Sequence, residues 1–312
     1  MKTEYYSTRA YHLNDLQILG WELTVCNALS LNGSSCRRVL KKDASYGKLL
    51  YTFLDRFMPM RELRRVLEIG GGYGCLMKDF LTLQPGLQAV MLDLSPVLLD
   101  QQRRTLDGLR AEFIHSDFLD IHASFLSGFD LAILNENLGD FPMVLNIGLD
   151  VFDTPAKAGG PVRQVLEFFE RYGLDRPTHN PFHCNIGAME VVEKLCSAGV
   201  PHIFLSEHSC EAVVPEPHRA YIDIRSEGNP ERIQLRGHDE HTIAFTPLQK
   251  IAAQLGYDCA RGPLADFIEV EFTDRLRFIL RSRLHLKEEH ETIRQFVGDL
   301  FKYEYLVLSR RF

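Results

Sequence analysis

The chain has 312 residues, of which 45% are hydrophobic and 25% are charged, and its formal net charge at pH 7 is −7. This composition predicts a globular protein with one large domain, or one domain with an elaboration. The acidic balance argues against a dedicated nucleic-acid-binding protein. No apolar run is long enough to predict a membrane span, and the polar N-terminus is unlike a signal peptide. The seven cysteines are scattered without a CxxC pair, which favours free thiols and a cytoplasmic location.

The first part of the chain, 1–62, is predicted to be an N-terminal helical segment. Apolar residues recur at helical spacing over 13–29, where Asn14 is a candidate N-cap, and again over 48–58. The rest of the chain, 63–312, is predicted to form a single domain.

Strands and helices alternate from Arg64 onwards. The expected strands lie at 64–70, 87–95, 111–118, 129–137 and 200–209, with one more after the helix 246–257 and a closing strand at 303–312. The helices between them are expected at 74–83, 96–109, 187–199, 246–257 and 288–301. This order predicts an α/β protein with a Rossmann-like, mostly parallel seven-stranded sheet and helices on both faces. A stretch rich in Pro, Gly and His, at about 141–185, is predicted to be an elaboration over the active-site edge, with a short helix at 162–173.

A glycine-rich turn follows the first predicted strand, in VLEIGGGYGCL (66–76). A dinucleotide fingerprint fails here because Cys75 occupies its third glycine position, and no P-loop is present. What fits is the pattern acid-x-Gly-x-Gly-x-Gly, formed by Glu68, Gly70, Gly72 and Gly74. Class I methyltransferases that use S-adenosylmethionine (SAM) are recognised by this pattern, and the sequence resembles them here.

The chemistry of SAM explains why an acid and glycines suit it. SAM has no phosphate, and its methionine end carries an ammonium group that favours nearby carboxylates such as Glu68. Glycines, Gly71 among them, let the backbone lie against a ligand without a Cβ atom in the way.

Two more acids fall at the ends of successive predicted strands, where ligands of open α/β sheets bind. Asp93 is placed to accept hydrogen bonds from both ribose hydroxyls, with Leu94 and Ser95 beside it in the turn. Asp117 is placed to accept from the adenine amine, and Phe118 to pack on the adenine ring.

The fourth predicted strand ends in LNENLGDFP (134–142), where the methyl acceptor is expected. Glu136 is predicted to position or deprotonate the acceptor, Asn135 to support it and to contact the cofactor, and Asp140 is the next catalytic candidate. The alternative reading is a polar loop in which Asn and Asp side chains cap a helix.

A narrower resemblance connects the chain with the MidA family, which includes the mitochondrial complex I assembly-factor arginine methyltransferase. The family's glycine motif is roughly E-x-G-P-G-R-G-x-L-x-x-D-x-L. The residues in register with it are Glu68, Gly70, Gly72, Gly74, Leu76, Asp79 and Leu81. The family's second strand runs into an acid and then Ser-Pro, as in DLSPVLLDQQ. Its fourth strand ends N-E-L-x-D-A-x-P, similar to 135–142 here, and the similarity covers roughly 64–270.

The chain also departs from that family. Gly71 and Tyr73 replace the proline and arginine of the motif, and Gly139 stands where the family has an aspartate. The N-terminal part has no counterpart of the family's G-Y-Y segment. The resemblance implies SAM as the cofactor and methyl transfer as the reaction, while the acceptor stays open between a protein side chain such as arginine and a small molecule.

These sequence patterns discriminate among three functions. A SAM-dependent methyltransferase is expected; the alternative is a non-catalytic SAM-binding assembly protein that retains the fold. An NAD-linked oxidoreductase is disfavoured by Cys75. No metal site is expected, because His238 and His241 in RGHDEHT lack the HExxH spacing and have no nearby cysteine. Neither nucleic acid nor membrane is expected as a partner, and a homodimer stays open.

Overall fold

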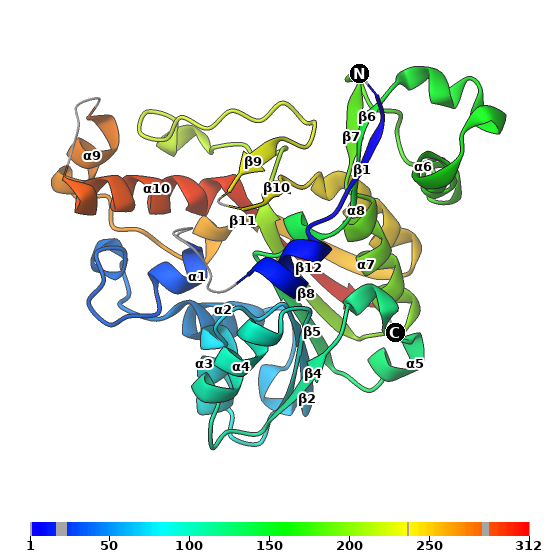
Figure 1. Cartoon of the computed structure of the whole chain (residues 1–312). Coiled ribbons are helices and arrows are strands. Elements are labelled where there is room, and N and C mark those ends of the chain that lie inside the picture. The colour runs from blue at the N-terminus through cyan, green and yellow to red at the C-terminus, as the bar shows by residue number, and fades with distance from the viewer. Residues whose placement is uncertain (1, 17–23, 236, 283–286, 312) are drawn as a thin grey trace.

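The computed structural model of the protein describes residues 2–16, 24–235, 237–282 and 287–311. Its centre is a seven-stranded sheet in the order β11-β12-β8-β5-β2-β3-β4 (Figure 1). The strands of this sheet are β2 (Arg65–Ile69), β3 (Gln88–Asp93), β4 (Ala111–His115), β5 (Leu131–Asn135), β8 (His202–His208), β11 (Tyr257–Pro263) and β12 (Tyr303–Arg310). β4, β3, β2, β5 and β8 are parallel, and β12 runs antiparallel to both of its neighbours.

Helices cover both faces of this sheet. The helices of eight or more residues are α2 (Tyr46–Leu54), α3 (Cys75–Leu83), α4 (Pro96–Thr105), α6 (Gly160–Arg171), α7 (Ile186–Ser197), α8 (Phe245–Gln254), α9 (Asp274–Arg281) and α10 (Glu288–Lys302). Two shorter helices are α1 (Val25–Ala28) and α5 (Ala123–Leu126). Alternate residues of β2 enter separate cores: Val66 packs with α2, α3 and α10, and Leu67 packs with α7 and α8. The predicted α/β fold with a mostly parallel seven-stranded sheet is confirmed.

A second sheet is built on the elaboration. It joins β1 (Glu4–Tyr6), β6 (Met143–Ile147) and β7 (Phe182–Cys184) as antiparallel neighbours, which lie side by side at the upper right of Figure 1. The helix predicted at 162–173 is present as α6. The strand β1 is not predicted by the sequence, and it ties the N-terminal segment to the elaboration. A hairpin of β9 (Arg232–Gln234) and β10 (Asp239–His241) contacts β1, where the Asp239 backbone N–H donates to the Tyr6 hydroxyl at 2.8 Å.

The prediction of one helix over 13–29 is tested only in part, because residues 17–23 lie outside the described residues. In the described parts, the helices differ from the predicted one. A short helix, Tyr11–Asp15, precedes residues 17–23, and α1 follows them. Asn14 is not an N-cap: it lies inside the short helix, and its amide donates back to the Ala10 carbonyl at 3.1 Å. The capping residue is Thr24, whose hydroxyl accepts from the Asn27 backbone N–H at 3.1 Å.

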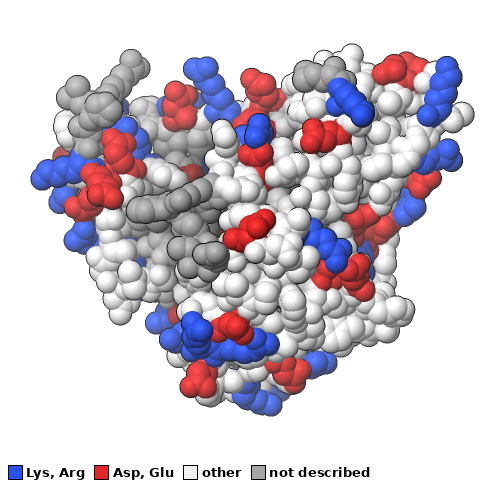
Figure 2. All heavy atoms as spheres, viewed as in Figure 1, with Lys and Arg blue, Asp and Glu red and all other residues white. Residues whose placement is uncertain are grey.

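Acidic and basic side chains are interspersed on the face of the molecule drawn in Figure 2. The described residues of this face therefore form no broad basic surface of the kind that binds nucleic-acid backbones. Among the described residues, no helix combines the length and apolar character that crossing a membrane requires.

The start of α7 packs very closely against the loop after β5, which gives a test of the fold. A Cβ atom on Gly187 would lie 2.5 Å from Pro142 Cδ and 2.6 Å from Pro142 N, so Gly187→Ala forces backbone to move. We expect this change to lower the free energy of unfolding by about 1–3 kcal/mol, as overpacking does, measured by urea denaturation. The matched control is Gly298→Ala in α10, where a Cβ atom meets nothing within 4 Å. It is expected to stabilise by about 0.5–1 kcal/mol through helix propensity, and equal effects of the two changes would contradict the packing.

Candidate functional site

A cavity of about 540 Å³ opens at the carboxyl ends of β2, β3, β4 and β5. Its lining comes from six segments of the chain, at 5–12, 24–27, 68–76, 92–98, 116–120 and 135–142. The predicted cofactor residues that line it are Glu68, Gly70, Gly71, Gly72, Asp93, Leu94, Asp117, Phe118 and Asn135, and the predicted catalytic residues Glu136 and Asp140 line it too. Gly74 and Ser95 do not line the cavity; they are the N-cap residues of α3 and α4 and lie next to lining residues in the chain.

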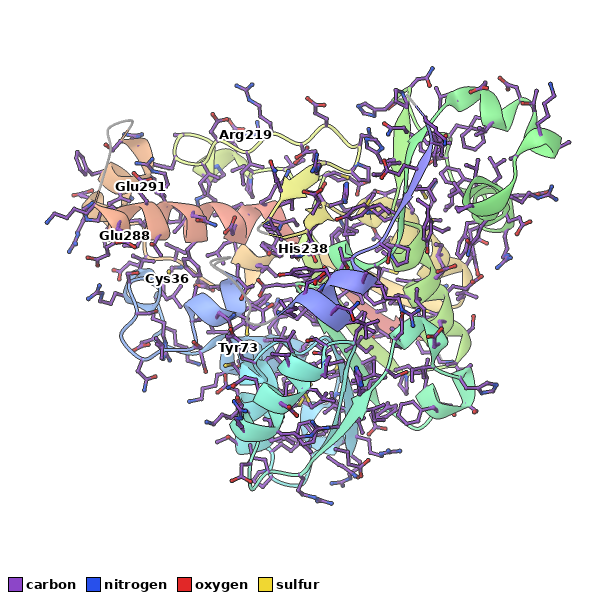
Figure 3. All side chains as sticks on the ribbon, viewed as in Figure 1. Cys36, Tyr73, Arg219, His238, Glu288 and Glu291 are labelled. Carbon is purple, nitrogen blue, oxygen red and sulfur yellow. The ribbon has the colours of Figure 1, made fainter. Side chains whose placement is uncertain are left out.

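The glycine turn connects β2 to α3. Gly70 has a φ of 65° and Gly74 a φ of 78°, in the left-handed region where glycine is favoured. A Cβ atom on Gly70 would collide with the amide of Asn137, which follows β5. That amide donates to the backbone carbonyl of Ile69 at the end of β2. The need for glycine at position 70 therefore comes from the neighbouring strand as well as from any ligand. Figure 3 labels Tyr73, which belongs to the same turn.

Glu68 is a buried carboxyl group beside this turn. Its side chain lies near the carboxyl end of β2, the residue is 2% exposed, and its Oε2 atom has no hydrogen-bond partner among the described residues. Burial, reinforced by the Asp93 carboxylate, raises the pKa of Glu68 to about 8. Because Glu68 lines the cavity and has a buried carboxyl oxygen without a partner, it predicts a ligand with a hydrogen-bond donor or a positive charge nearby.

Asp93 is held in a fixed orientation at the end of β3. Its Oδ1 accepts from the Ser95 backbone N–H at 2.8 Å, and its Oδ2 accepts from the Gln102 amide at 2.7 Å. Burial raises the pKa of Asp93 to about 6, and these two hydrogen bonds oppose that rise. Each carboxylate oxygen has a second lone pair, so this group can still accept from a ligand.

Asp117 already has two partners. Its Oδ1 accepts from the Leu119 backbone N–H at 2.9 Å, and its Oδ2 pairs with the Arg9 guanidinium at 3.1 Å. Phe118 is 2% exposed, and its ring packs edge-on against Phe141. The role of these residues toward an adenine ring stays a prediction, and Arg9 is a cation at this site that the sequence does not predict.

Asn135, the last residue of β5, and Glu136 after it form a half-buried polar junction. Asn135 Oδ1 accepts from the Tyr46 hydroxyl and, at 2.9 Å, from the Ser206 hydroxyl, while its amide donates to Glu136 Oε1 at 3.0 Å. Glu136 has a φ of 55°, which is uncommon for a residue with a side chain. The side chains of Asn135 and Glu136 are thus fixed relative to each other.

Glu136 also holds the amino end of α1. Its carboxylate accepts from the backbone N–H of Val25 at 2.7 Å and of Cys26 at 2.9 Å. Burial raises the pKa of Glu136 to about 7, and these hydrogen bonds oppose the rise. The carboxyl group lines the cavity and is therefore both a structural contact of α1 and a proton-holding group near neutral pH.

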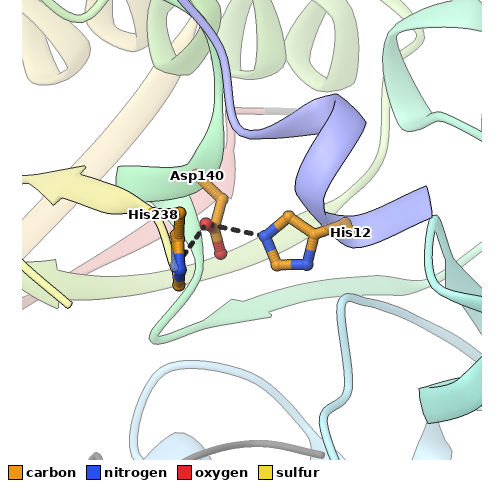
Figure 4. A group of neighbouring side chains, drawn as sticks. All are labelled: His12, Asp140 and His238. Carbon is orange, nitrogen blue, oxygen red and sulfur yellow. Dashed lines mark hydrogen bonds and ion pairs between the residues drawn. The ribbon is translucent and has the colours of Figure 1, made fainter. Parts of the chain in front are cut away.

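Asp140 lies between two histidines, as Figure 4 shows. Its Oδ1 is 2.9 Å from His12 Nε2 and 3.8 Å from His238 Nε2. Burial alone lowers the pKa of His12, but the nearby carboxylates, Asp140 first, raise it above its usual value. His241, which the sequence pairs with His238, lies edge-on to Tyr6 instead, and burial lowers its pKa to about 4.

The N-terminal contribution to this cavity is not predictable from local sequence patterns. Arg9 and His12 belong to a short polar stretch, and Tyr46 looks like a core residue of a helix. Their roles depend on packing between segments far apart in the chain, and a single sequence carries no signal for such contacts.

Comparison with known proteins identifies the fold. No family model and no curated protein matches the chain. Among solved structures, an uncharacterised COG1565 superfamily protein from Burkholderia thailandensis is similar, with a TM-score of 0.55, 15% identity, and coverage of 98% of this chain and 87% of that one. At this identity the likeness shows a shared fold and nothing more.

Two further structures are similar at a lower level. A COG1565 superfamily member from the same organism, bound to S-adenosyl-homocysteine, has a TM-score of 0.47 and 15% identity, and the match covers 85% of this chain and 76% of that one. The magnesium protoporphyrin IX methyltransferase of Synechocystis, with bound SAH, has a TM-score of 0.43 and 10% identity, with coverage of 85% and 82%. What these proteins bind is a property of those proteins.

The raised pKa of Glu68 predicts how stability depends on pH. A carboxyl group whose folded pKa, about 8, lies above its unfolded value of 4.5 favours the folded state below pH 4.5, and this contribution is lost as pH rises through 8. In the wild type, the free energy of unfolding should therefore fall between pH 5 and pH 8. In Glu68→Gln we expect this fall to be smaller by about 1–4 kcal/mol, measured by denaturation at a series of pH values without added ligand. The control Glu170→Gln changes an exposed residue of α6 and should leave the slope as it is. If the free energy of unfolding depends on pH in the same way in both variants, this would count against the burial of Glu68.

Proposed function

We propose that the protein is a SAM-dependent methyltransferase whose acceptor is a protein side chain or a small molecule. The observation that carries this proposal is the carboxyl group of Glu68, a residue that lines the cavity at the carboxyl ends of the parallel strands and whose buried Oε2 atom has no hydrogen-bond partner among the described residues. An ammonium group is the ligand group that such an oxygen accepts best.

The residues around the cavity fit SAM in their chemistry. Glu68 would accept from the ammonium of the methionine end, and Asp93 would accept from the ribose hydroxyls with its remaining lone pairs. Asp117 and Phe118 would face the adenine, with the Arg9–Asp117 pair limiting how freely that carboxylate can turn. The turn at Gly70–Gly72 supplies backbone that lines the cavity without side chains.

When bound, SAM supplies a methyl group already activated by the positive charge of its sulfonium. The chain then needs to align the acceptor and exclude water. Glu136 is suited to this task because two backbone N–H groups and the Asn135 amide fix its position. Its pKa of about 7 allows it to take up a proton near neutral pH. Asp140 is the second candidate, through its contact with His12.

A second candidate function is a non-catalytic SAM-binding assembly protein. The contacts of Glu136 with the amino end of α1 favour it, because a carboxylate engaged by backbone N–H groups can serve structure alone. The resemblance of the sequence to the MidA family supports the enzyme and names protein arginine as the first acceptor to test.

The cofactor is tested by calorimetry on the purified chain. We expect SAM and S-adenosylhomocysteine to bind and NAD not to bind. Asp93→Asn keeps the shape of the side chain and removes its charge, and should weaken SAM binding by about 1–3 kcal/mol. The control Asp107→Asn changes an exposed aspartate after α4 and should bind SAM like the wild type. Tight binding of NAD without binding of SAM would refute the proposal, and thermal melts of each variant check that it is folded.

The catalytic role of Glu136 is tested with Glu136→Gln. If Glu136 acts on the acceptor, SAM affinity should change little, while transfer of labelled methyl groups to a lysate of the source cell should fall by about 10²–10⁴-fold. If the carboxylate only orders α1, affinity and transfer should change together and mildly. Glu170→Gln is again the exposed control. Transfer at the wild-type rate would remove Glu136 from the mechanism, and SAM binding without any transfer by the wild type would favour the non-catalytic alternative.

A further inference from the structure

Three potential metal ligands converge at the rim of the cavity from distant parts of the chain. His12 comes from the short helix Tyr11–Asp15, Asp140 from the loop after β5, and His238 from the hairpin of β9 and β10 (Figure 4). Among the described residues they form a group whose ligand atoms all lie within 4.8 Å of one another. Sequence spacing does not reveal this group, because no two of its members share a motif.

We propose that His12, Asp140 and His238 bind one divalent transition-metal cation, with Zn²⁺ as the ion that fits best. Two imidazole nitrogens and one carboxylate oxygen are a ligand set that Zn²⁺ takes in sites with three protein ligands. Mg²⁺ and Ca²⁺ prefer sets made of oxygen alone, which this group does not offer.

The distances suit a small metal ion. Ligand atoms about 2.0–2.1 Å from a tetrahedral Zn²⁺ lie about 3.3 Å from each other. The distances from Asp140 Oδ1 are 2.9 Å to His12 Nε2 and 3.8 Å to His238 Nε2, on either side of that value. A slight opening of the first pair and closing of the second brings both to that value, and the two histidine ligand atoms lie within 4.8 Å of each other.

The three side chains are shielded from water and held in place. Their exposed fractions are 15% for His12, 21% for Asp140 and 6% for His238. The His238 ring stacks on Tyr11, with ring centroids 4.1 Å apart, and the Asp140 backbone carbonyl accepts from the Thr8 hydroxyl at 2.8 Å. Contacts that orient the ligands in this way raise the affinity of a metal site.

Neighbouring groups provide further ligands for the proposed metal ion, from Glu240 and from the cavity. Glu240 Oε1 lies 3.2 Å from His238 Nε2 and offers a second carboxylate beside the metal position. His12 and Asp140 also line the cavity, so a coordination position left open by the three protein ligands can be filled from the cavity, by water or by a ligand atom. A bound metal would also connect the N-terminal segment to the loop after β5 and to the hairpin.

The test uses the full chain, freed of metal with a chelator and then titrated with Zn²⁺ by calorimetry. One equivalent of Zn²⁺ should bind to the wild type. His12→Ala and His238→Ala should each weaken it by at least about 100-fold, beyond the usual effect of an orienting residue. Asp140→Asn, which keeps the shape of the side chain, should weaken it by about 10-fold or more. His122→Ala, which changes an exposed histidine at the start of α5, is the matched control and should bind like the wild type.

Co²⁺ substitution distinguishes this site from binding at the free thiols. Nitrogen and oxygen ligands give visible d–d bands, whereas thiolate ligands such as Cys26 or Cys75 add an intense near-ultraviolet charge-transfer band. Visible bands without the charge-transfer band, lost in the His12 and His238 variants, support the site. Absence of Zn²⁺ binding, binding that survives in both histidine variants, or a thiolate band would each overturn it. Because SAM binding is measured separately, failure of this site and failure of the proposed function are distinguishable.

Discussion

The hydrogen bonds made by the last residue of β5 and by the two residues after it hold the site together. Asn135 connects to α2 and β8, Glu136 binds the backbone at the amino end of α1, and Asn137 binds the backbone at the end of β2. These partners are far apart in the chain and meet only at this junction. Since these contacts are partly buried, a partner left unpaired would lose hydration without gaining a hydrogen bond in return. The positions of the glycine turn and of the N-terminal segment therefore depend on one another through this junction.

Buried acids give the same end of the sheet its electrostatic character. The pKa values of Glu68, Asp93, Glu136 and Glu207 are raised to about 8, 6, 7 and 8, with burial as the main cause in each. Without a cation nearby, such groups resist full ionisation at neutral pH. A ligand with a positive charge would stabilise the ionised form of these buried groups and would bind more tightly as a result. The ligands proposed here, SAM and a metal cation, would both bring positive charge to the end of the sheet where these carboxyl groups lie.

Much of the fold, but less of the site, follows from the sequence. The strands from Arg65 onwards alternate with helices whose apolar spacing is regular, so the sheet and its helices could be predicted, and Glu68 and Asp93 lie at strand ends as expected. The strand β1 has three residues, too few for a periodic signal. The use of Glu136 to hold α1, and the approach of His12 to Asp140, arise from contacts between distant segments that no local pattern encodes. The structural role of Gly70, toward Asn137, has the same origin.

The position of β12 has a consequence for how the sheet forms. β12 follows β8 and β11 in the chain, yet it lies between them, and within the described part of the chain β11 pairs with β12 alone. Until β12 arrives, β8 has an unpaired edge and β11 is unattached, a state that exposes backbone donors and acceptors to other chains. The pairings of β12 span long stretches of sequence, and contacts of this kind form slowly. The step that completes the sheet is thus also the step that pairs the free edge of β8, so rapid docking of β12 would protect the folding chain from aggregation.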